Sequence, residues 1–152
     1  MLSQTAEYAL RAVLYLANRD DGQPVRVDEI GAALGIPANY LSKTLNTLVR
    51  ARVLASLRGP HGGFRLAVAA EDLPLLRVVG PFDQIVQRRS CLLGNPECSD
   101  RHACAAHRAW KETAEKVQEF FRTTTIADIR ASDATLTRGA PRTSPSRARR
   151  SA

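Results

Sequence analysis

The chain of 152 residues lacks any run of about 18 apolar residues, the length that a membrane-spanning helix requires. Segment 1–17 includes the charged residues Glu7 and Arg11 and has no small-residue cleavage site, so it is not typical of a secretory signal. We therefore expect a cytoplasmic protein with no membrane partner.

Cysteine is scarce: the chain has three, and no two of them form the C-x-x-C pair typical of thiol redox enzymes. An enzyme is therefore not expected. In a reducing cytosol, a clustered odd set of cysteines favours metal binding or thiol reactivity over structural disulfides.

Acidic residues are absent from residues 138–152, which contain five arginines. The formal charge is +7, so residues 1–137 carry only 7 − 5 = +2. The Arg/Ser/Pro-rich end, 131–152, is predicted to be a disordered basic tail that adds non-specific affinity for nucleic acid. A hydrophobic share of 44% is sufficient for a core in the remainder.

Two amphipathic helices are predicted first. Leu10, Val13, Leu14 and Ala17 follow helical spacing. A second, shorter helix begins at about Asp28, with Ile30, Ala33 and Leu34 directed inward. It ends at Gly35, a residue that tolerates the left-handed geometry of a helix end.

A third helix is predicted to begin at Pro37, with Leu41, Leu45 and Leu48 directed to the core. This leaves polar side chains on its outer faces that suit bases and phosphates: Asn39, Tyr40, Ser42, Lys43, Asn46, Thr47 and Arg50. A helix, a tight turn and a polar-faced helix form the helix-turn-helix arrangement, whose second helix enters the major groove of DNA. The alternative is an ordinary helical hairpin.

The next segment favours DNA binding. Residues 53–57 and 64–68 are predicted strands around a tight loop, which together form a wing. Gly62 and Gly63 would let the backbone lie close to DNA, and Arg58, His61 and Arg65 would reach phosphate or the minor groove. We predict a mainly α winged helix-turn-helix domain over residues 1–82. A wing that docks protein is the alternative.

Two further helices are predicted. Leu73, Leu76, Val79 and Phe82 indicate a short helix that ends at residues 80–81. A long helix over about 103–122 carries an apolar stripe at Trp110, Ala114, Val117 and Phe121, which one small domain could hardly cover. The stripe favours a homodimer formed with the same helix of a second chain. A plain core helix is the alternative. Residues 123–129 add a final turn.

All three cysteines lie in a window whose spacing is C-x6-C-x5-C: Cys91, Cys98 and Cys104. His107 follows three residues after the last cysteine, and Gly94, Asn95 and Pro96 bend the segment. Such a loop can wrap soft ligands around one iron or zinc centre. His102 is expected to be a surface residue. Residues 83–130 are predicted to form the cysteine loop and dimerisation helix.

Four segments resemble the IscR/NsrR-type family of bacterial winged-helix regulators: 3–10 (SQTAEYAL), 35–42 (GIPANYLS), 58–64 (RGPHGGF) and 104–110 (CAAHRAW). The resemblance covers roughly residues 1–130. It implies a homodimer that binds double-stranded operator DNA, taken here as a repressor, and that senses redox state, nitric oxide or iron-sulfur supply through a cluster.

The resemblance also implies a ligand set. Cys91, Cys98 and Cys104 match the three thiolate ligands of an iron-sulfur cluster, with 2Fe-2S favoured over 4Fe-4S. The fourth ligand is His107, as in the IscR branch, or Glu7 from the partner subunit, as in the NsrR branch. A structural zinc and a cluster-free thiol switch at the same cysteines are the alternatives.

The chain departs from the IscR pattern in two places. The first cysteine gap is one residue longer than usual, which affects loop geometry and cluster type. Ser42 replaces an acidic residue of the recognition helix that helps the cluster state choose between DNA sites. We therefore expect a change in DNA affinity rather than in sequence preference.

Overall fold

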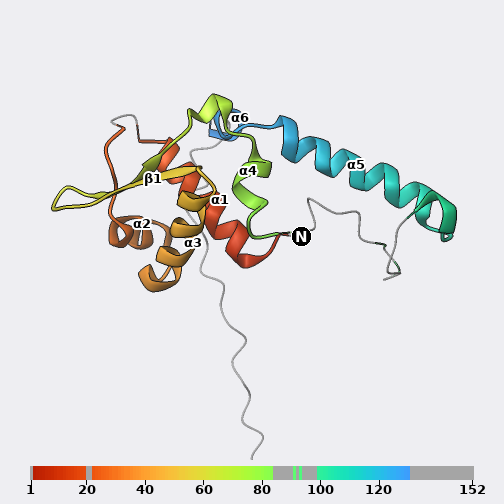
Figure 1. Ribbon diagram of the computed structural model, residues 1–152, viewed down its shortest axis with the longest axis horizontal. Helices are drawn as coiled ribbons and strands as arrows, with labels where there is room; N and C mark the ends of the chain where they lie inside the picture. Colours follow the sequence, from red (N-terminus) through yellow and green to blue (C-terminus); the bar gives the residue numbers. More distant parts are fainter. Residues whose placement is uncertain (1, 20–21, 84–90, 92, 94–98, 131–152) are drawn as a thin grey trace, which may run out of the picture.

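The computed structural model describes residues 2–19, 22–83, 91, 93 and 99–130, and it has a winged-helix body from which one long helix extends (Figure 1). The elements in chain order are α1 (Gln4–Ala17), α2 (Val27–Leu34), α3 (Ala38–Arg50), β1 (Leu54–Leu57), β2 (Gly63–Leu66), η1 (Ala70–Asp72), α4 (Leu75–Val79), η3 (Asp100–His102), α5 (His107–Thr123) and α6 (Ile126–Arg130). The predicted fold class, mainly α with a small β-hairpin, is confirmed. The predicted disorder of residues 131–152 lies outside the described residues.

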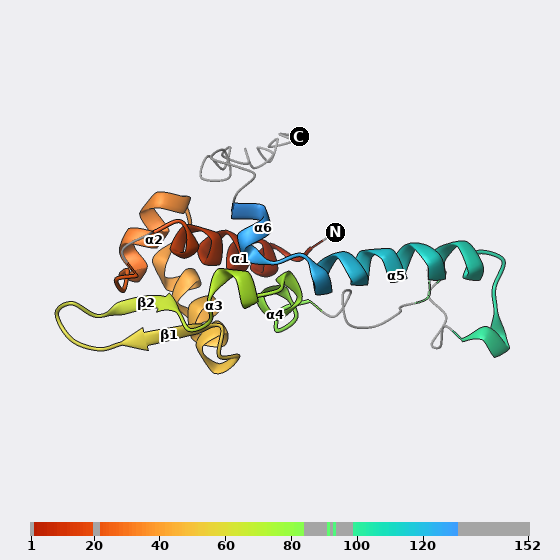
Figure 2. The ribbon, with the colours of Figure 1, turned by 90° about the horizontal axis from the view of Figure 1, so that it is seen from above.

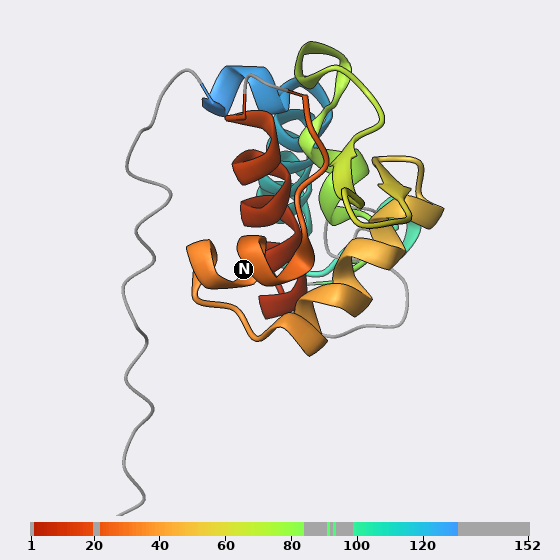
Figure 3. The ribbon, with the colours of Figure 1, turned by 90° about the vertical axis from the view of Figure 1, so that its left-hand side faces the viewer.

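The first helix, α1, is the centre of the body, and α2, α3, α4 and α6 pack against it (Figure 3). Ala6, Ala9 and Ala12 are fully buried, and such small side chains allow neighbouring helices to approach closely. At the start of α1, Ser3 accepts a hydrogen bond from the backbone N–H of Ala6, which satisfies one of the unpaired donors of the first turn. The carboxylate of Asp83 accepts a hydrogen bond from the N–H of Ser3 at 2.7 Å, and it thereby joins the segment after α4 to α1.

The turn between α2 and α3 depends on two glycines. Gly35 has φ +66°, and its N–H donates to the carbonyl of Gly31, as predicted for a left-handed helix end. A Cβ at Gly31 would lie 2.7 Å from the carbonyl oxygen of Ile36, so only glycine fits there. The prediction that Ala33 points inward is wrong. Ala33 is exposed, because the buried face of α2 is made by Ile30, Gly31 and Leu34.

The third helix, α3, packs against the core through the leucines that were predicted to point inward. Leu41, Leu45 and Leu48 are fully buried, and Pro37 precedes the first turn. Thr44 is also buried, and its hydroxyl donates to the carbonyl of Tyr40 at 3.4 Å. A polar side chain at this inward position is tolerated because that hydrogen bond satisfies the hydroxyl.

The wing is a two-stranded antiparallel hairpin in which Leu54 pairs with Leu66 and Leu57 pairs with Gly63. Both strands are shorter than predicted. The hairpin is anchored at its base because Val25 and Phe64 exchange two backbone hydrogen bonds, of 2.9 and 2.8 Å.

The short helix α4 differs from its prediction. The buried residues are Leu73, Leu75, Val78 and Val79, whereas Leu76 is only partly buried. The segment before Leu73 is a 3-10 turn, and the helix begins only at Leu75, after Pro74. The phase of the helix is therefore shifted from the one that the apolar spacing indicated.

The long helix α5 extends away from the body, and α6 returns to it (Figure 2). α5 begins at His107, four residues later than predicted, because residues 100–102 form a 3-10 turn. The return is fixed by two backbone hydrogen bonds of 2.9 Å, from Leu75 N–H to Thr124 and from Ile126 N–H to Leu73. Arg130 then donates to the carbonyl of Ala17 at 3.0 Å. We call α5 and the turn before it, residues 99–123, the arm, and residues 2–19 and 22–83 with α6 the body.

Candidate nucleic-acid interface and metal centre

The outer face of α3 is polar and open to solvent. Asn39, Lys43, Asn46 and Arg50 are exposed, and Ser42 is half-buried. The guanidinium of Arg50 donates to the hydroxyl of Thr47 at 3.0 Å, which leaves its other donors for an outside partner. The face that the sequence predicted for DNA contact is therefore accessible.

Tyr40 differs from its neighbours because α1 also holds it. Its hydroxyl shares a hydrogen bond of 2.5 Å with Thr5, and its ring packs edge-on against Tyr8 with a centroid distance of 5.6 Å. The hydroxyl of Tyr8 in turn accepts a hydrogen bond from Gln4. Tyr40 therefore fixes the first turn of α3 to α1, a role that the sequence analysis missed.

The wing extends on the same side of the body as α3 and carries exposed cationic residues (Figure 2). Arg58 and His61 are in its loop, and Arg65 is on β2.

The two glycines of the wing, Gly62 and Gly63, have structural roles of their own. A Cβ at Gly62 would lie 2.3 Å from the carbonyl oxygen of Leu57. Gly63 has φ +154°, and a Cβ there would lie 2.4 Å from the carbonyl oxygen of Val25. The conformation of the wing thus requires both glycines irrespective of DNA.

This surface carries cations without an acidic partner among the described residues. Several cations elsewhere are paired with acids, as in Arg19–Glu29, Arg108–Glu112, Lys111–Asp100, Arg122–Glu119 and Arg130–Glu71. Lys43, Arg50, Arg58 and Arg65 form no ion pair within the described part of the chain. Positive charge that no acid neutralises attracts phosphate.

The segment 99–106, which contains Cys104 and precedes α5, lies at the opposite end of the molecule from the wing (Figure 2). Cys91 and Cys104 are half-buried and neither forms a disulfide, whereas Cys98 lies outside the described residues. The N–H of His107 donates to the carbonyl of Cys104 at 2.9 Å, so these two predicted ligands lie in one turn of chain.

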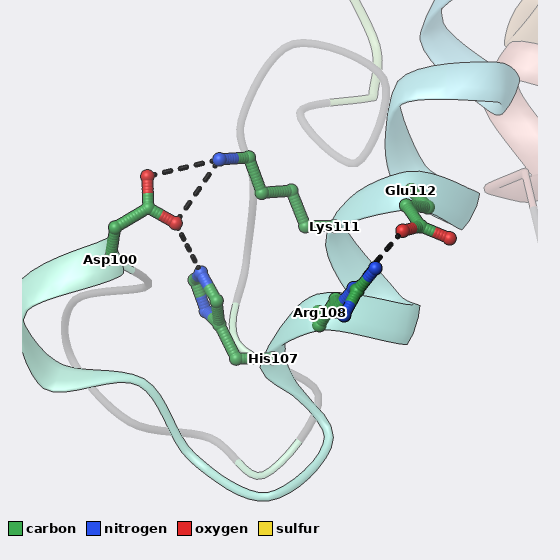
Figure 4. Close-up of polar contacts among 5 residues, drawn as sticks. All are labelled: Asp100, His107, Arg108, Lys111 and Glu112. Carbon is green, nitrogen blue, oxygen red and sulfur yellow. Dashed lines mark hydrogen bonds and ion pairs between the residues drawn. The ribbon is translucent and has the colours of Figure 1, made fainter.

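The imidazole of His107 is buried, and its Nε2 forms a hydrogen bond of 2.9 Å with Oδ1 of Asp100 (Figure 4). Lys111 donates to both oxygens of the same carboxylate, at 2.9 and 3.1 Å. The hydrogen bond from Lys111, followed by that from His107, lowers the pKa of Asp100 below its ordinary value of 3.8. Asp100 is not among the residues predicted from the sequence. The only sequence feature that indicates this contact is the i, i+4 spacing of His107 and Lys111, which places both on one face of a helix.

The donors present fit a soft-metal centre. Half-buried thiols that form no disulfide, and an imidazole three residues after one of them, are ligand types that iron-sulfur clusters and zinc accept. Within residues 2–19, 22–83, 91, 93 and 99–130, no three candidate ligands are gathered at one point, and Cys98 is outside these ranges. Glu7 is exposed in the first turn of α1, which lies in the body and apart from the start of α5.

The arm has an apolar groove lined by Thr113, Lys116, Val117, Phe120 and Phe121, with a volume of about 350 Å³. Phe120 is 52% exposed and packs edge-on against Phe121. Of the predicted stripe, Trp110, Ala114 and Val117 are half-buried and Phe121 is buried. Phe120 lies outside the predicted stripe and is the most exposed apolar residue of the groove.

None of the helices in the described ranges is both long and apolar enough to cross a membrane.

Comparison with known proteins gives a consistent result. Residues 2–132 match the Rrf2 family model, described as an iron-dependent transcriptional regulator. A helix-turn-helix transcriptional regulator of Aquifex aeolicus is 36% identical over 132 residues, which are 85% of this chain and 90% of the relative. The transcriptional regulator IscR of Vibrio atlanticus is 29% identical over 128 residues, covering 84% of this chain and 73% of that protein.

A solved structure has the same fold. CymR of B. subtilis, described as a global cysteine regulator, superposes with a TM-score of 0.71 and 20% identity. The match covers 88% of this chain and 98% of CymR.

Proposed function

The chain belongs to the Rrf2 family of transcriptional regulators, and we propose that it is a DNA-binding repressor whose operator affinity is set by an iron-sulfur cluster at its cysteine window. The family members are transcriptional regulators and not enzymes. The observation that supports the proposal is the separation between an unpaired cationic face on α3 and the wing, and the segment with Cys104 and His107 at the start of α5.

We assign the residues that would contact operator DNA from their positions on α3 and the wing. Residues near the start of a recognition helix meet base edges. Asn39, Ser42, Lys43 and Asn46 are therefore proposed for base and nearby phosphate contact, with Tyr40 mainly holding the helix in position. The other cationic residues and the wing loop are proposed to contact the DNA backbone and the minor groove. These residues are Arg50, Arg58, His61, Gly62, Gly63 and Arg65.

The arm is proposed to form the homodimer. A helix with an exposed phenylalanine beside an apolar groove gains stability when a second copy covers it, because the apolar surface leaves water. Trp110, Ala114, Val117 and Phe121, together with Phe120, are the proposed interface. Two copies of α3 would then read half-sites about 34–36 Å apart.

A cluster would be held by Cys91, Cys98 and Cys104, with His107 or Glu7 of the partner subunit as the fourth ligand. It would supply a redox-sensitive centre that loses stability under oxidation or nitric oxide. Because Cys104 and His107 adjoin the first turn of α5, the conformation of the window affects how the dimer helix begins. A shift there would change the spacing of the two recognition helices and so the number of DNA contacts that both can make.

The decisive experiment is anaerobic purification of the full chain, followed by a visible spectrum and by assays of iron and acid-labile sulfide. The expected result is a coloured protein with iron and sulfide in equal amounts, both lost in Cys104→Ala and retained in His102→Ala. Colourless protein with stoichiometric zinc, or without metal, would contradict the cluster. The half-buried thiols of Cys91 and Cys104, which form no disulfide, would in that case favour a structural zinc or a thiol switch.

A further inference from the structure

Asp100 is bound from two sides by residues of α5, and it belongs to none of the ligand sets considered above. Its Oδ1 lies 2.9 Å from Nε2 of His107, and Nζ of Lys111 lies 2.9 and 3.1 Å from its two oxygens (Figure 4). His107 and Lys111 are four residues apart and therefore share one face of α5. The carboxylate, which comes from the 3-10 turn, joins that turn to the helix across this face.

The three side chains differ in their exposure. Asp100 is 73% exposed and Lys111 is 31% exposed, whereas the imidazole of His107 is only 9% exposed. A lysine that contacts both oxygens keeps the carboxylate beside the helix although the carboxylate faces solvent. Asp100 thus orients the buried imidazole of His107, and Lys111 holds Asp100 in position.

This contact also determines the protonation pattern of the ring. An ionised carboxylate can only accept hydrogen bonds, so Nε2 of His107 must carry the proton that it donates to Asp100. In a neutral imidazole the lone pair then lies on Nδ1, which is the atom by which this ring would bind a metal. Metal-binding histidines commonly donate their second ring N–H to a carboxylate, which fixes the tautomer and increases the basicity of the ligand.

We propose that Asp100 is a positioning residue that orients His107 as the fourth ligand of the centre at the cysteine window, with Lys111 holding Asp100 in place. This inference rests on the proposed function, because it requires a metal centre. It selects His107 over Glu7 of the partner subunit. The pair Arg108–Glu112, one residue along the same helix from His107 and Lys111, is the matched surface contact: its distance is 3.6 Å and its side chains are 94% and 63% exposed (Figure 4).

The test uses the full chain, reconstituted anaerobically as wild type and as five variants: His107→Ala, Asp100→Ala, Asp100→Asn, Lys111→Met and Glu112→Ala. The readouts are the visible circular dichroism and electron paramagnetic resonance spectra of the centre, and the rate of iron loss to a chelator. Asp100→Ala is expected to shift the spectra in the direction of His107→Ala and to speed iron loss by about 10- to 100-fold, the usual effect of losing such a partner. Lys111→Met is expected to give a smaller change of the same kind.

The conservative variant separates positioning from folding. Asp100→Asn keeps an oxygen that accepts from Nε2, so most of the wild-type spectrum should be restored, while Glu112→Ala should leave it unchanged. Wild-type spectra in Asp100→Ala, combined with an altered His107→Ala, would overturn the positioning role. Wild-type spectra in His107→Ala would show that His107 is not a ligand and would overturn the inference while leaving the proposed function intact. Wild-type chain without iron and sulfide would instead contradict the proposed function, and this inference with it.

Discussion

The body and the arm of this molecule are stabilised in different ways. The body has a continuous core made by α1, α3, α4, Val25, Val53 and Ile126. The arm has almost none, because His107 and Phe121 are the only buried residues of the 17-residue helix α5. The body can therefore fold on its own contacts. The arm has few such contacts, and under the proposed function a second chain and a metal centre would supply most of its stability.

The distribution of charge follows the same division. Three of the five cations on the arm are paired with Glu112, Glu119 and Asp100, whereas the exposed cations of α3 and the wing are not paired with any described acid. With five cations and four acids, the arm carries a formal charge of only 5 − 4 = +1, which suits packing against a second copy. A body with an unpaired cationic face suits a polyanion.

Ile126→Ala tests where the body ends, and it should have the largest effect on folding. Ile126 is fully buried although it follows the arm in sequence, so removing its side chain should lower the free energy of unfolding by about 2–5 kcal/mol. Urea unfolding of the full chain measures this. Ile129→Ala, at a half-buried position of the same helix, is the control and should cost less. Equal costs for the two would mean that α6 is not part of the core.

Phe120→Asp tests whether a second copy completes the arm. A carboxylate buried against an apolar groove is costly, so the dimer dissociation constant should rise by about 100-fold, equivalent to roughly 3 kcal/mol. Analytical ultracentrifugation measures the constant. Glu119→Gln changes an exposed neighbour and should leave it unchanged. A dimer as strong as wild type in Phe120→Asp would exclude this groove as the interface.

Gly63→Ala tests the rigidity of the wing within the body. The added Cβ would approach the backbone of Val25 at a φ that side chains rarely adopt, so a loss of about 1–3 kcal/mol is expected in thermal unfolding. Gly35→Ala introduces positive-φ strain at φ +66° but meets no atom within 4 Å, and it should cost less. A larger loss of stability in Gly35→Ala than in Gly63→Ala would contradict the claim that the close approach of Val25 requires glycine at position 63.

Arg58→Ala tests the cationic face and should have the smallest effect. DNA affinity should fall across all sequences by less than about 1 kcal/mol, and the slope of log affinity against log salt should decrease by about one, as expected for one lost phosphate contact. Fluorescence anisotropy over a salt series measures both. Arg122→Ala, which removes a cation paired with Glu119 on the arm, should change neither. Altered sequence preference in Arg58→Ala would indicate base readout instead.

The sequence predicts the body well because its features are local and periodic. The spacing of Leu41, Leu45 and Leu48 gave the buried face of α3, and Gly35 gave the end of α2. Periodicity was misleading in the five-residue helix α4, which is too short to define a phase once a 3-10 turn and Pro74 precede it. The fold was thus predictable wherever a helix was long enough to repeat its pattern.

The contacts that matter at the candidate sites join distant segments, and no spacing encodes them. Tyr40 was predicted to contact DNA, and the structure shows that Thr5 and Tyr8 of another helix also hold it. Asp100 is separated from His107 by an irregular stretch whose path the sequence does not specify. Phe120 lies outside the regular apolar stripe of α5, so the helical spacing did not predict it as part of the interface. For Tyr40 and Asp100 the missing information was a contact between two elements, and for Phe120 it was which face of α5 the body leaves exposed.

The most direct test of the central claim compares the DNA affinity of one protein in two states. An operator is selected from a random-sequence library with the anaerobically purified chain, and its dissociation constant is then measured before and after the cluster is removed by a chelator under reducing conditions. We expect the dissociation constant to change by at least about fivefold, within the usual range of coupling between two sites, and not to change in Cys104→Ala treated in the same way. Equal affinity of the two wild-type states would contradict the claim that the cysteine window controls the winged helix.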